Sequence, residues 1–267
     1  MKSILRYPGS KWNLSKRIVN LLPEHKTYLE PYFGSGAVLF NKPASPIETI
    51  NDLNGDIVNL FQVIQSEPEL LQERLWLIPY SRSVYDSAWK AKPTDEVDQA
   101  VNFVIRSTMS HGFRVFEKSG WKRDVSGREA AYAVRHWNSL PEIIQDMALR
   151  LKGVQIEKRP ALRLIAEFSR PEAVIYLDPP YVLSTRTREQ YSHEMTNSDH
   201  LELLELLNQS KANILLSGYD SKLYNQQLSN WNRLEFSATA EKGLHRTEVL
   251  WTNFQPAQQL ELFGGIS

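Results

Sequence analysis

A short apolar run at residues 173–177, followed directly by Asp178-Pro179-Pro180-Tyr181, constrains the fold more than any other feature of the chain. An apolar run of this length predicts a buried strand. Neither proline carries an N–H group for a sheet ladder, so the strand has to end before the tetrapeptide. Open α/β sheets bind their ligands beyond the carboxyl ends of their strands. The tetrapeptide is therefore expected at a ligand site.

The rest of the chain shows strand patterns at both ends and a helical part between them. The strand–helix–strand order in the first 65 residues predicts a parallel sheet, and the last two strand patterns predict a hairpin. Residues 67–151 show mostly helical periodicity, within which residues 107–127 predict a long loop. The predicted strands are residues 27–30, 48–52, 154–157, 174–177, 213–217, 233–238 and 248–254.

The composition excludes several classes of protein. The chain has 267 residues and no cysteine, so disulfides and thiolate metal sites are excluded. No apolar stretch reaches the roughly 18 residues of a membrane span, and the N-terminus lacks the apolar core of a signal peptide. We therefore expect a soluble cytoplasmic protein. The formal net charge is zero, which argues against a strongly basic nucleic-acid binder.

Basic residues nevertheless gather in two segments of this neutral chain. Residues 1–26 carry six basic residues against one acidic residue, and residues 106–136 carry seven against three. Such clusters are as often solvated faces as they are binding surfaces. Composition alone leaves both interpretations open.

A glycine-containing turn, Pro31-Tyr32-Phe33-Gly34-Ser35-Gly36, follows the first predicted strand. Its glycines let the backbone approach a ligand closely. Leu39 stands where a dinucleotide-binding motif has its third glycine, which argues against NAD. Asp52 ends the next strand, where an acid can bind both hydroxyls of a ribose. A plain turn and a helix-capping aspartate are the simpler interpretations, but the spacing favours a nucleoside site without a phosphate loop, which fits S-adenosylmethionine.

The tetrapeptide offers the groups that an exocyclic amino group needs. The two N–H bonds of such a group can go to the Asp178 carboxylate and the Pro179 carbonyl, which makes the nitrogen lone pair more available for attack on a methyl sulfonium. Pro180 stiffens the chain, and Tyr181 can stack on the substrate ring. This chemistry needs no metal. The simpler interpretation is a strand that ends in a proline turn, which the upstream glycine turn and Asp52 disfavour.

Together these motifs resemble those of the DNA N6-adenine methyltransferases of the Dam type, in the alpha class, over nearly the whole chain. The residues that carry the resemblance are 7–11 (Tyr-Pro-Gly-Ser-Lys), 30–36, 51–52, 178–181, 215–219 and 246–251. Residues 157–161 depart from the family's pattern, so the contact with the cofactor adenine is not assigned, although Arg159 and Pro160 stand at that place.

The resemblance implies a fold and a division into domains. The fold is α/β, with the Rossmann-like mixed seven-stranded sheet of the class I S-adenosylmethionine-dependent methyltransferases. Residues 1–60 and 151–255 form the cofactor-binding and catalytic domain. Residues 61–150 form a helical target-recognition insert that binds DNA, and residues 256–267 form a flexible C-terminal tail.

The resemblance also implies a reaction and its residues. The protein is expected to methylate adenine N6 in double-stranded DNA at a short site, after flipping the base out of the duplex, as a monomer in the cytoplasm of a bacterial or phage-infected cell. The catalytic residues are Asp178, Pro179, Pro180 and Tyr181. The expected contacts with S-adenosylmethionine are Tyr7, Lys11, Pro31, Phe33, Gly34, Ser35, Gly36, Asp52 and Asp178, and those with DNA are Arg106, Arg114, Lys122, Arg123, Arg135 and Arg186.

Other targets and a further partner stay open at this point. Cytosine N4 in DNA, adenine in RNA and a protein glutamine amide present a similar planar amine, and a catalytically inactive DNA-binding relative is a separate alternative. Residues Gln259-Leu260-Glu261-Leu262-Phe263 resemble the pentapeptide by which bacterial replication and repair proteins bind the sliding clamp. The simpler interpretation is an amphipathic tail that packs on its own domain.

Overall fold

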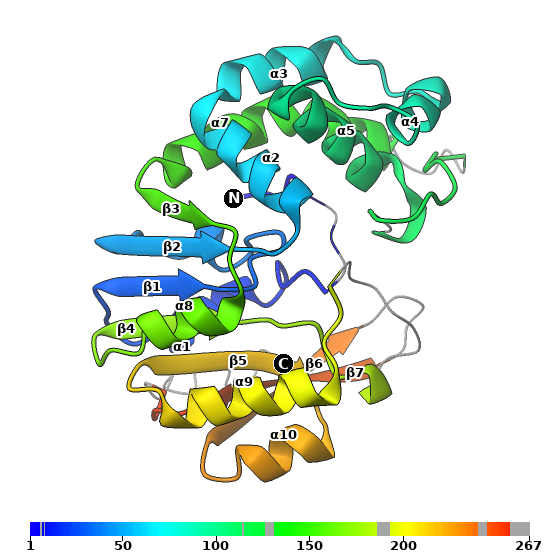
Figure 1. Ribbon diagram of the computed structural model, residues 1–267. Coiled ribbons are helices and arrows are strands. Elements are labelled where there is room, and N and C mark those ends of the chain that lie inside the picture. The colour runs from blue at the N-terminus through cyan, green and yellow to red at the C-terminus, as the bar shows by residue number, and fades with distance from the viewer. Residues whose placement is uncertain are drawn as a thin grey trace, which may run out of the picture.

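The computed structural model describes residues 1–5, 7, 9–113, 115–125, 131–185, 193–239 and 245–256. Its centre is a seven-stranded sheet with the strand order β3-β2-β1-β4-β5-β7-β6 (Figure 1). β7 runs antiparallel to both of its neighbours, and the other adjacent pairs are parallel. The strands are β1 Thr27–Glu30, β2 Ile47–Asn51, β3 Val154–Glu157, β4 Ala173–Leu177, β5 Asn213–Tyr219, β6 Asn232–Thr239 and β7 His245–Thr252.

The sheet confirms the predicted mixed α/β fold, because each predicted strand overlaps one of these seven. Alternation along the central strands builds a hydrophobic core on each face, since consecutive residues of a strand point to opposite faces. Val174 packs in one core and Ile175 in the other, and Leu215 and Leu216 divide in the same way. All of β4 is buried, as expected for a strand that is covered on both faces.

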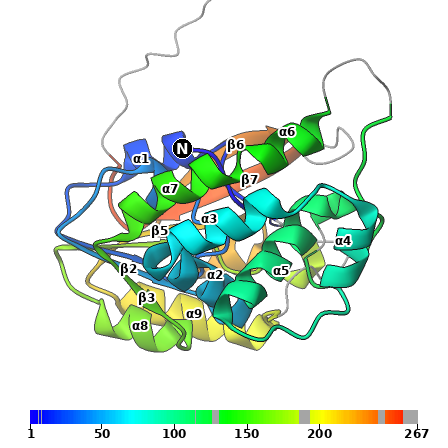
Figure 2. The ribbon, with the colours of Figure 1, turned by 90° about the horizontal axis from the view of Figure 1, so that it is seen from above.

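The helices fall into two groups. α8, α9 and α10 pack on one face of the sheet and α1 on the other. α2 to α7 form a helical layer next to the β3 edge, and this layer shares one hydrophobic core with α1 and its face of the sheet (Figures 1 and 2). The helices are α1 Ser15–Leu21, α2 Gly55–Ser66, α3 Pro68–Leu77, α4 Arg82–Ala88, α5 Glu96–Met109, α6 Tyr132–Asn138, α7 Leu140–Leu151, α8 Ala161–Glu167, α9 Asn197–Gln209 and α10 Lys222–Gln227, with 3-10 turns at Leu39–Asn41, His111–Phe113 and Leu183–Thr185.

One local prediction differs from the structure. α5 continues to Met109, so the first residues of the loop predicted at 107–127 are helical. Ser107 and Thr108 fit a buried helix face there because both hydroxyls donate to the Val104 carbonyl within the helix. The division of the chain into a catalytic and a recognition domain stays a prediction.

The strand order creates a topological switch point between β1 and β4. These strands are neighbours, but β2 and β3 follow on one side of the pair and β5 on the other. Ligands of open α/β sheets bind at such a point, beyond the carboxyl ends of the strands. The glycine turn follows β1 and Asp178 follows β4, so the fold brings the two predicted motifs to the same edge.

Candidate active site

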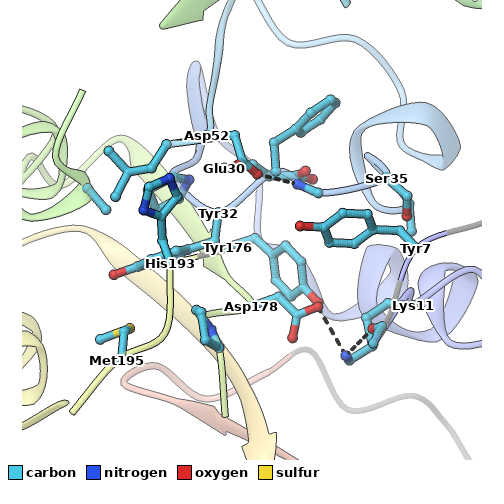
Figure 3. A pocket seen from close by; sticks show the side chains of 18 of the residues that line it. Tyr7, Lys11, Glu30, Tyr32, Ser35, Asp52, Tyr176, Asp178, His193 and Met195 are labelled. Atoms are coloured by element: carbon cyan, nitrogen blue, oxygen red, sulfur yellow. Dashed lines mark hydrogen bonds and ion pairs between the residues drawn. The ribbon is translucent and has the colours of Figure 1, made fainter. Parts of the chain in front are cut away.

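A cavity of about 390 Å³ lies at this switch point, within the volume range of small-molecule sites. Its wall is made by the N-terminal segment, the turn after β1, the residues after β2 and β4, and the segment before α9 (Figure 3). The predicted site residues on the wall are Tyr7, Lys11, Pro31, Phe33, Gly34, Ser35, Asp52, Asp178 and Pro180. Gly36, Pro179 and Tyr181 lie outside the described wall.

The turn after β1 depends on both of its glycines, for different reasons. Gly34 has a φ of +52° and Gly36 a φ of +69°, in the left-handed region that side chains disfavour. A Cβ atom on Gly36 would also lie 2.5 Å from the Phe33 ring and 2.6 Å from the Phe40 ring. Gly36 therefore serves the packing of the turn, and Gly34 is the glycine that lies on the cavity.

Asp52 is held by backbone groups. Its Oδ2 accepts a hydrogen bond from the Gly34 N–H at 2.9 Å, and its Oδ1 accepts one from the Asn54 N–H at 2.9 Å. Burial raises the pKa of Asp52, and these N–H groups offset part of that effect. Each carboxylate oxygen retains a second lone pair, so Asp52 can still accept hydrogen bonds from ligand hydroxyls.

Asp178 has a different environment from Asp52. Its Oδ2 accepts a hydrogen bond from Lys11 Nζ at 3.0 Å, whereas its Oδ1 is buried and receives none from the described residues. Burial alone would lower the pKa of Lys11, but the carboxylates of Asp178 and Glu248 outweigh it and raise that pKa. A buried acceptor without a partner costs on the order of 1–3 kcal/mol. Asp178 therefore presents an oxygen that an N–H group of a ligand would satisfy.

Tyr181 packs beside this carboxylate. Its hydroxyl donates to Glu248 Oε2 at 2.7 Å, and its ring meets the Tyr219 ring edge-on at a centroid distance of 4.5 Å. Lys11 Nζ lies 4.8 Å from the Tyr181 ring centroid. Burial raises the pKa of Tyr181 well above its usual value, and Asp178 and Glu248 add to this. The stacking of Tyr181 on a substrate ring stays a prediction.

The wall also contains residues outside the predicted catalytic and cofactor-binding sets. His193 and Met195, from the segment before α9, lie on the side of the cavity away from Lys11 (Figure 3). Pro160 lines the wall after β3, together with the two residues that follow it, whereas Arg159 forms an ion pair with Glu167 instead. Pro160 follows β3 closely, so its place on the wall agrees with the rule that ligands bind beyond the carboxyl ends of strands.

Glu30, the last residue of β1, is a further carboxyl group on the wall and is 2% exposed. Burial raises the pKa of Glu30 to about 8, although a hydrogen bond from the Tyr28 hydroxyl acts in the opposite direction. The Glu30 carboxyl group is therefore mostly neutral at pH 7, so its charge is not available to a ligand there.

The predicted DNA contacts lie in unlike environments. Arg106 on α5 pairs with Asp56 at 2.9 Å, and its guanidinium carbon lies 5.5 Å from the centroid of the Trp89 ring. This ion pair joins α5 to α2, which gives Arg106 a structural role within the helical layer. A phosphate contact from Arg106 would compete with that ion pair.

Other predicted DNA contacts are more accessible or lie outside the described residues. Arg123 and Arg135 are exposed. Lys122 is half-buried, with Nζ 5.3 Å from the centroid of the Tyr132 ring. Arg114, Arg186 and the predicted clamp-binding residues 259–263 lie outside the described part of the chain.

Two further observations, on metal sites and on membrane-spanning helices, concern only the described residues. They contain no group of three or more His, Asp or Glu side chains placed to hold a metal ion. The helices formed by those residues include none with the length and apolar character of a membrane span.

The fold and the site define a class of protein. The mostly parallel seven-stranded sheet, with an acid after β2 and Asp-Pro-Pro-Tyr after β4, agrees with what the resemblance to the N6-adenine methyltransferases implies. A family model of the D12 class N6 adenine-specific DNA methyltransferases matches residues 7–241. The chain belongs to this family, which confirms the resemblance to Dam-type enzymes and the reaction, S-adenosylmethionine-dependent methylation of adenine N6 in DNA.

Individual relatives with methyltransferase names match this chain over most of its length. The type II methyltransferase M1.LlaDCHI of Lactococcus lactis subsp. cremoris is 23% identical over 279 residues, which cover 95% of this chain and 96% of that protein. The DNA adenine methylase of Vibrio cholerae is 23% identical over 239 residues, or 82% of each chain. The type II methyltransferase M.MjaIII of Methanocaldococcus jannaschii is 25% identical over 252 residues, covering 81% of this chain and 84% of the relative.

The described residues of the cavity fit S-adenosylmethionine. The Asp52 carboxylate can accept hydrogen bonds from the ribose hydroxyls. Asp178 lines the same wall, and one of its carboxylate oxygens is buried and has no partner in the part of the chain that the structure describes. A sulfonium cation is favourable beside carboxylates in a partly buried site. One continuous cavity therefore carries the acid predicted for the cofactor and the acid predicted for the substrate.

Proposed function

We propose that Asp178 and the Pro179 carbonyl accept the two N–H bonds of adenine N6 while the methyl group is transferred. The observation that carries this proposal is that Asp178, which lines the cavity together with Asp52, has a buried Oδ1 without a partner among the described residues. Fixing both N–H bonds draws the nitrogen lone pair out of conjugation with the ring and orients it toward the methyl donor.

The cofactor-binding residues on the same wall have separable roles in this proposal. S-adenosylmethionine supplies an electrophilic methyl group when it is bound. Asp52 binds the ribose hydroxyls, and the turn at Gly34 and Ser35 lets the backbone approach the cofactor. Lys11 keeps one oxygen of Asp178 occupied, which leaves the other for the substrate. Tyr181 stacks on the target base in the complex with DNA.

We further propose that the substrate is double-stranded DNA and that the target base is flipped into the cavity, because a paired base cannot reach Asp178. The layer α2 to α7 supplies the target-recognition surface, with Arg123, Arg135 and Lys122 as candidates for contacts to phosphate or bases. The enzyme acts in the cytoplasm. We also propose that the enzyme acts as a monomer.

Nucleoside analysis tests this function against its alternatives. Duplex DNA that contains many short sequences is incubated with the protein and methyl-labelled S-adenosylmethionine, then digested and examined by mass spectrometry. The proposal requires N6-methyladenine, with less product from single-stranded DNA and at least about 100-fold slower formation by the Asp178→Asn variant. N4-methylcytosine, or label that enters only RNA or protein, would replace it with one of the alternatives. No transfer to any of these would favour an inactive DNA-binding relative.

The C-terminal pentapeptide supports a separate proposal from its sequence alone. Its Gln-Leu pair followed by two apolar anchors, Leu262 and Phe263, suits the hydrophobic cleft of a bacterial sliding clamp. A pull-down with the purified clamp compares the wild-type chain with a Leu262→Ala/Phe263→Ala variant. Loss of retention in the variant supports docking, and equal retention rejects it.

A further inference from the structure

Glu248 lies next to the catalytic tetrapeptide without lining the described cavity wall. It comes from β7, whereas Tyr181 follows β4, and the two are joined by the hydrogen bond from the Tyr181 hydroxyl to Glu248 Oε2. The same oxygen lies 4.0 Å from Lys11 Nζ. The Glu248 side chain is 12% exposed, so both interactions occur where water screens charge poorly.

The sheet fixes where this carboxylate stands. β7 pairs with β5 in antiparallel register, and Glu248 faces Tyr219 across the two strands. The Tyr219 ring packs edge-on against Tyr181. Strand pairing, and not a loop, therefore places Glu248 beside Tyr181. A supporting group on a strand is held more precisely than one on a loop.

Lys11 connects Glu248 to the reacting carboxylate. Its ammonium group lies 3.0 Å from Asp178 Oδ2 and 4.0 Å from Glu248 Oε2. Its side chain is 5% exposed, so the charge has little contact with solvent. A buried ammonium shared by two carboxylates has a narrower range of positions than one that is paired with a single carboxylate.

From this arrangement we infer that Glu248 is a positioning residue for methyl transfer. Through Tyr181 it fixes the last residue of the tetrapeptide, and through Lys11 it keeps the ammonium group at Asp178 Oδ2, so that Oδ1 stays free for the amino group of the substrate. This inference rests on the proposed role of Asp178. According to this inference, Glu248 contacts neither the substrate nor the cofactor. It affects the rate of methyl transfer and not the binding of either ligand.

The test separates the transfer rate from cofactor affinity. Glu248→Gln keeps the size of the side chain and an acceptor for the Tyr181 hydroxyl but removes the charge. We expect the single-turnover rate at saturating cofactor and DNA to fall about 10- to 100-fold, the effect of losing one charge-assisted interaction. The dissociation constant of S-adenosylmethionine, from calorimetry on the same preparation, should change by less than about threefold.

A double-mutant cycle adds a readout that a general loss of stability would not reproduce. Tyr181→Phe removes only the hydroxyl that donates to Glu248. The combined loss of rate in the Glu248→Gln/Tyr181→Phe variant should be smaller than the product of the two single losses, because the two groups act as a unit. If the rate loss of the double variant equals the product of the two single losses, the inference is contradicted. If Glu248→Gln does not fold, Tyr181→Phe alone tests the inference. A wild-type transfer rate in Tyr181→Phe overturns the inference.

The control is Glu235→Gln on the neighbouring strand β6. Glu235 is an exposed acid that pairs with Arg233, opposite Val249 in the ladder, and its substitution should leave the transfer rate unchanged. A wild-type rate in Glu248→Gln, or an equal loss of rate and cofactor affinity, overturns the role of Glu248. The Asp178→Asn variant separates the two claims. Its full activity would overturn the proposed function itself, whereas an inactive Asp178→Asn beside a fully active Glu248→Gln overturns only the inference.

Discussion

Two carboxylates on the same cavity wall, Asp52 and Asp178, are held in different ways. Asp52 accepts a backbone N–H on each oxygen, from Gly34 and Asn54. Asp178 accepts one ammonium hydrogen bond, from Lys11, and its other oxygen has no partner among the described residues. The first carboxylate is fixed before any ligand arrives, and the second leaves one strong acceptor to be completed by a ligand.

The difference separates binding from chemistry. A carboxylate fixed by backbone suits a cofactor, which presents the same ribose in every turnover. An acceptor that is completed only by the substrate contributes most when the amino group is in place, which is the condition for an effect on the rate of transfer. The substitutions below change one side of this comparison at a time.

The largest effect is expected from Asp178→Asn. The amide keeps the shape of the side chain but loses the charge that Lys11 pairs with and that the amino group needs. The single-turnover rate should fall about 100- to 1,000-fold, as when one preorganised electrostatic contact is lost. Cofactor affinity should fall much less. Equal losses of rate and affinity would erase the distinction between the two carboxylates.

The next largest effect is expected on the free energy of unfolding, from substitutions in the glycine turn. Gly36→Ala combines a positive φ with a Cβ contact at 2.5 Å from the Phe33 ring, so it should lower the free energy of unfolding by about 2–4 kcal/mol. Gly34→Ala is the matched control, because its Cβ would meet Tyr7 only at 3.5 Å, and it should cost about 1–2 kcal/mol. Chemical denaturation measures both, and the reverse order would contradict the packing role of Gly36.

The binding side of the comparison is tested by Asp52→Asn. The amide lacks the charge and half of the acceptor capacity of the carboxylate, so the dissociation constant of S-adenosylmethionine should rise about 10- to 100-fold. The transfer rate at saturating cofactor should change by less than about threefold. Asp86→Asn, on α4 and outside the described cavity wall, serves as the control. A loss of rate at saturation without a loss of affinity would reverse the assignment of Asp52.

Another carboxyl group of the cavity wall, Glu30, makes the stability of the protein depend on pH. Its pKa is about 8 in the folded protein and near 4.5 when unfolded, so its contribution is full below pH 4.5 and is lost as the pH rises through 8. Wild-type stability should therefore fall on the order of 1–3 kcal/mol between pH 5 and pH 8 relative to Glu30→Gln. Thermal unfolding at both pH values measures this. Parallel curves for the two proteins would show that Glu30 is already ionised in the fold.

The smallest effect concerns DNA binding. Arg123 is exposed, so Arg123→Ala should weaken DNA binding by only a fewfold, lower the slope of log affinity against log salt by about one, and leave transfer at saturating DNA unchanged. Arg106→Ala should instead destabilise the fold, because it breaks the ion pair with Asp56. Swapped outcomes would place the DNA surface elsewhere in the helical layer.

Much of this arrangement could be predicted from the sequence because it depends on local patterns. The apolar run before Asp178, the glycines after β1 and Asp52 after β2 each mark the end of a strand, and strand ends converge at a switch point. The helical character of residues 67–151 followed from periodicity, although the end of α5 did not, because Ser107 and Thr108 resemble loop residues until their hydroxyls are seen to bond within the helix.

The remaining features join residues that are distant in the chain. Lys11 and Asp178 are separated by 167 positions, and Tyr181 and Glu248 by 67. Nothing in the local sequence pairs these partners, since strand order and register decide which side chains meet. The ion pair of Arg106 with Asp56 is of the same kind, which is why a charge that was predicted for DNA is paired within the helical layer.

The central claim is that the free oxygen of Asp178 is the acceptor for the target amino group. A crystal structure with duplex DNA and an unreactive analogue of S-adenosylmethionine tests it most directly. We predict that the flipped adenine places N6 at about 2.7–3.2 Å from Asp178 Oδ1, with the ribose of the analogue on Asp52 and Lys11 still on Asp178 Oδ2. An adenine N6 bound elsewhere, with Asp178 Oδ1 still unpartnered or turned toward Lys11, would contradict the account.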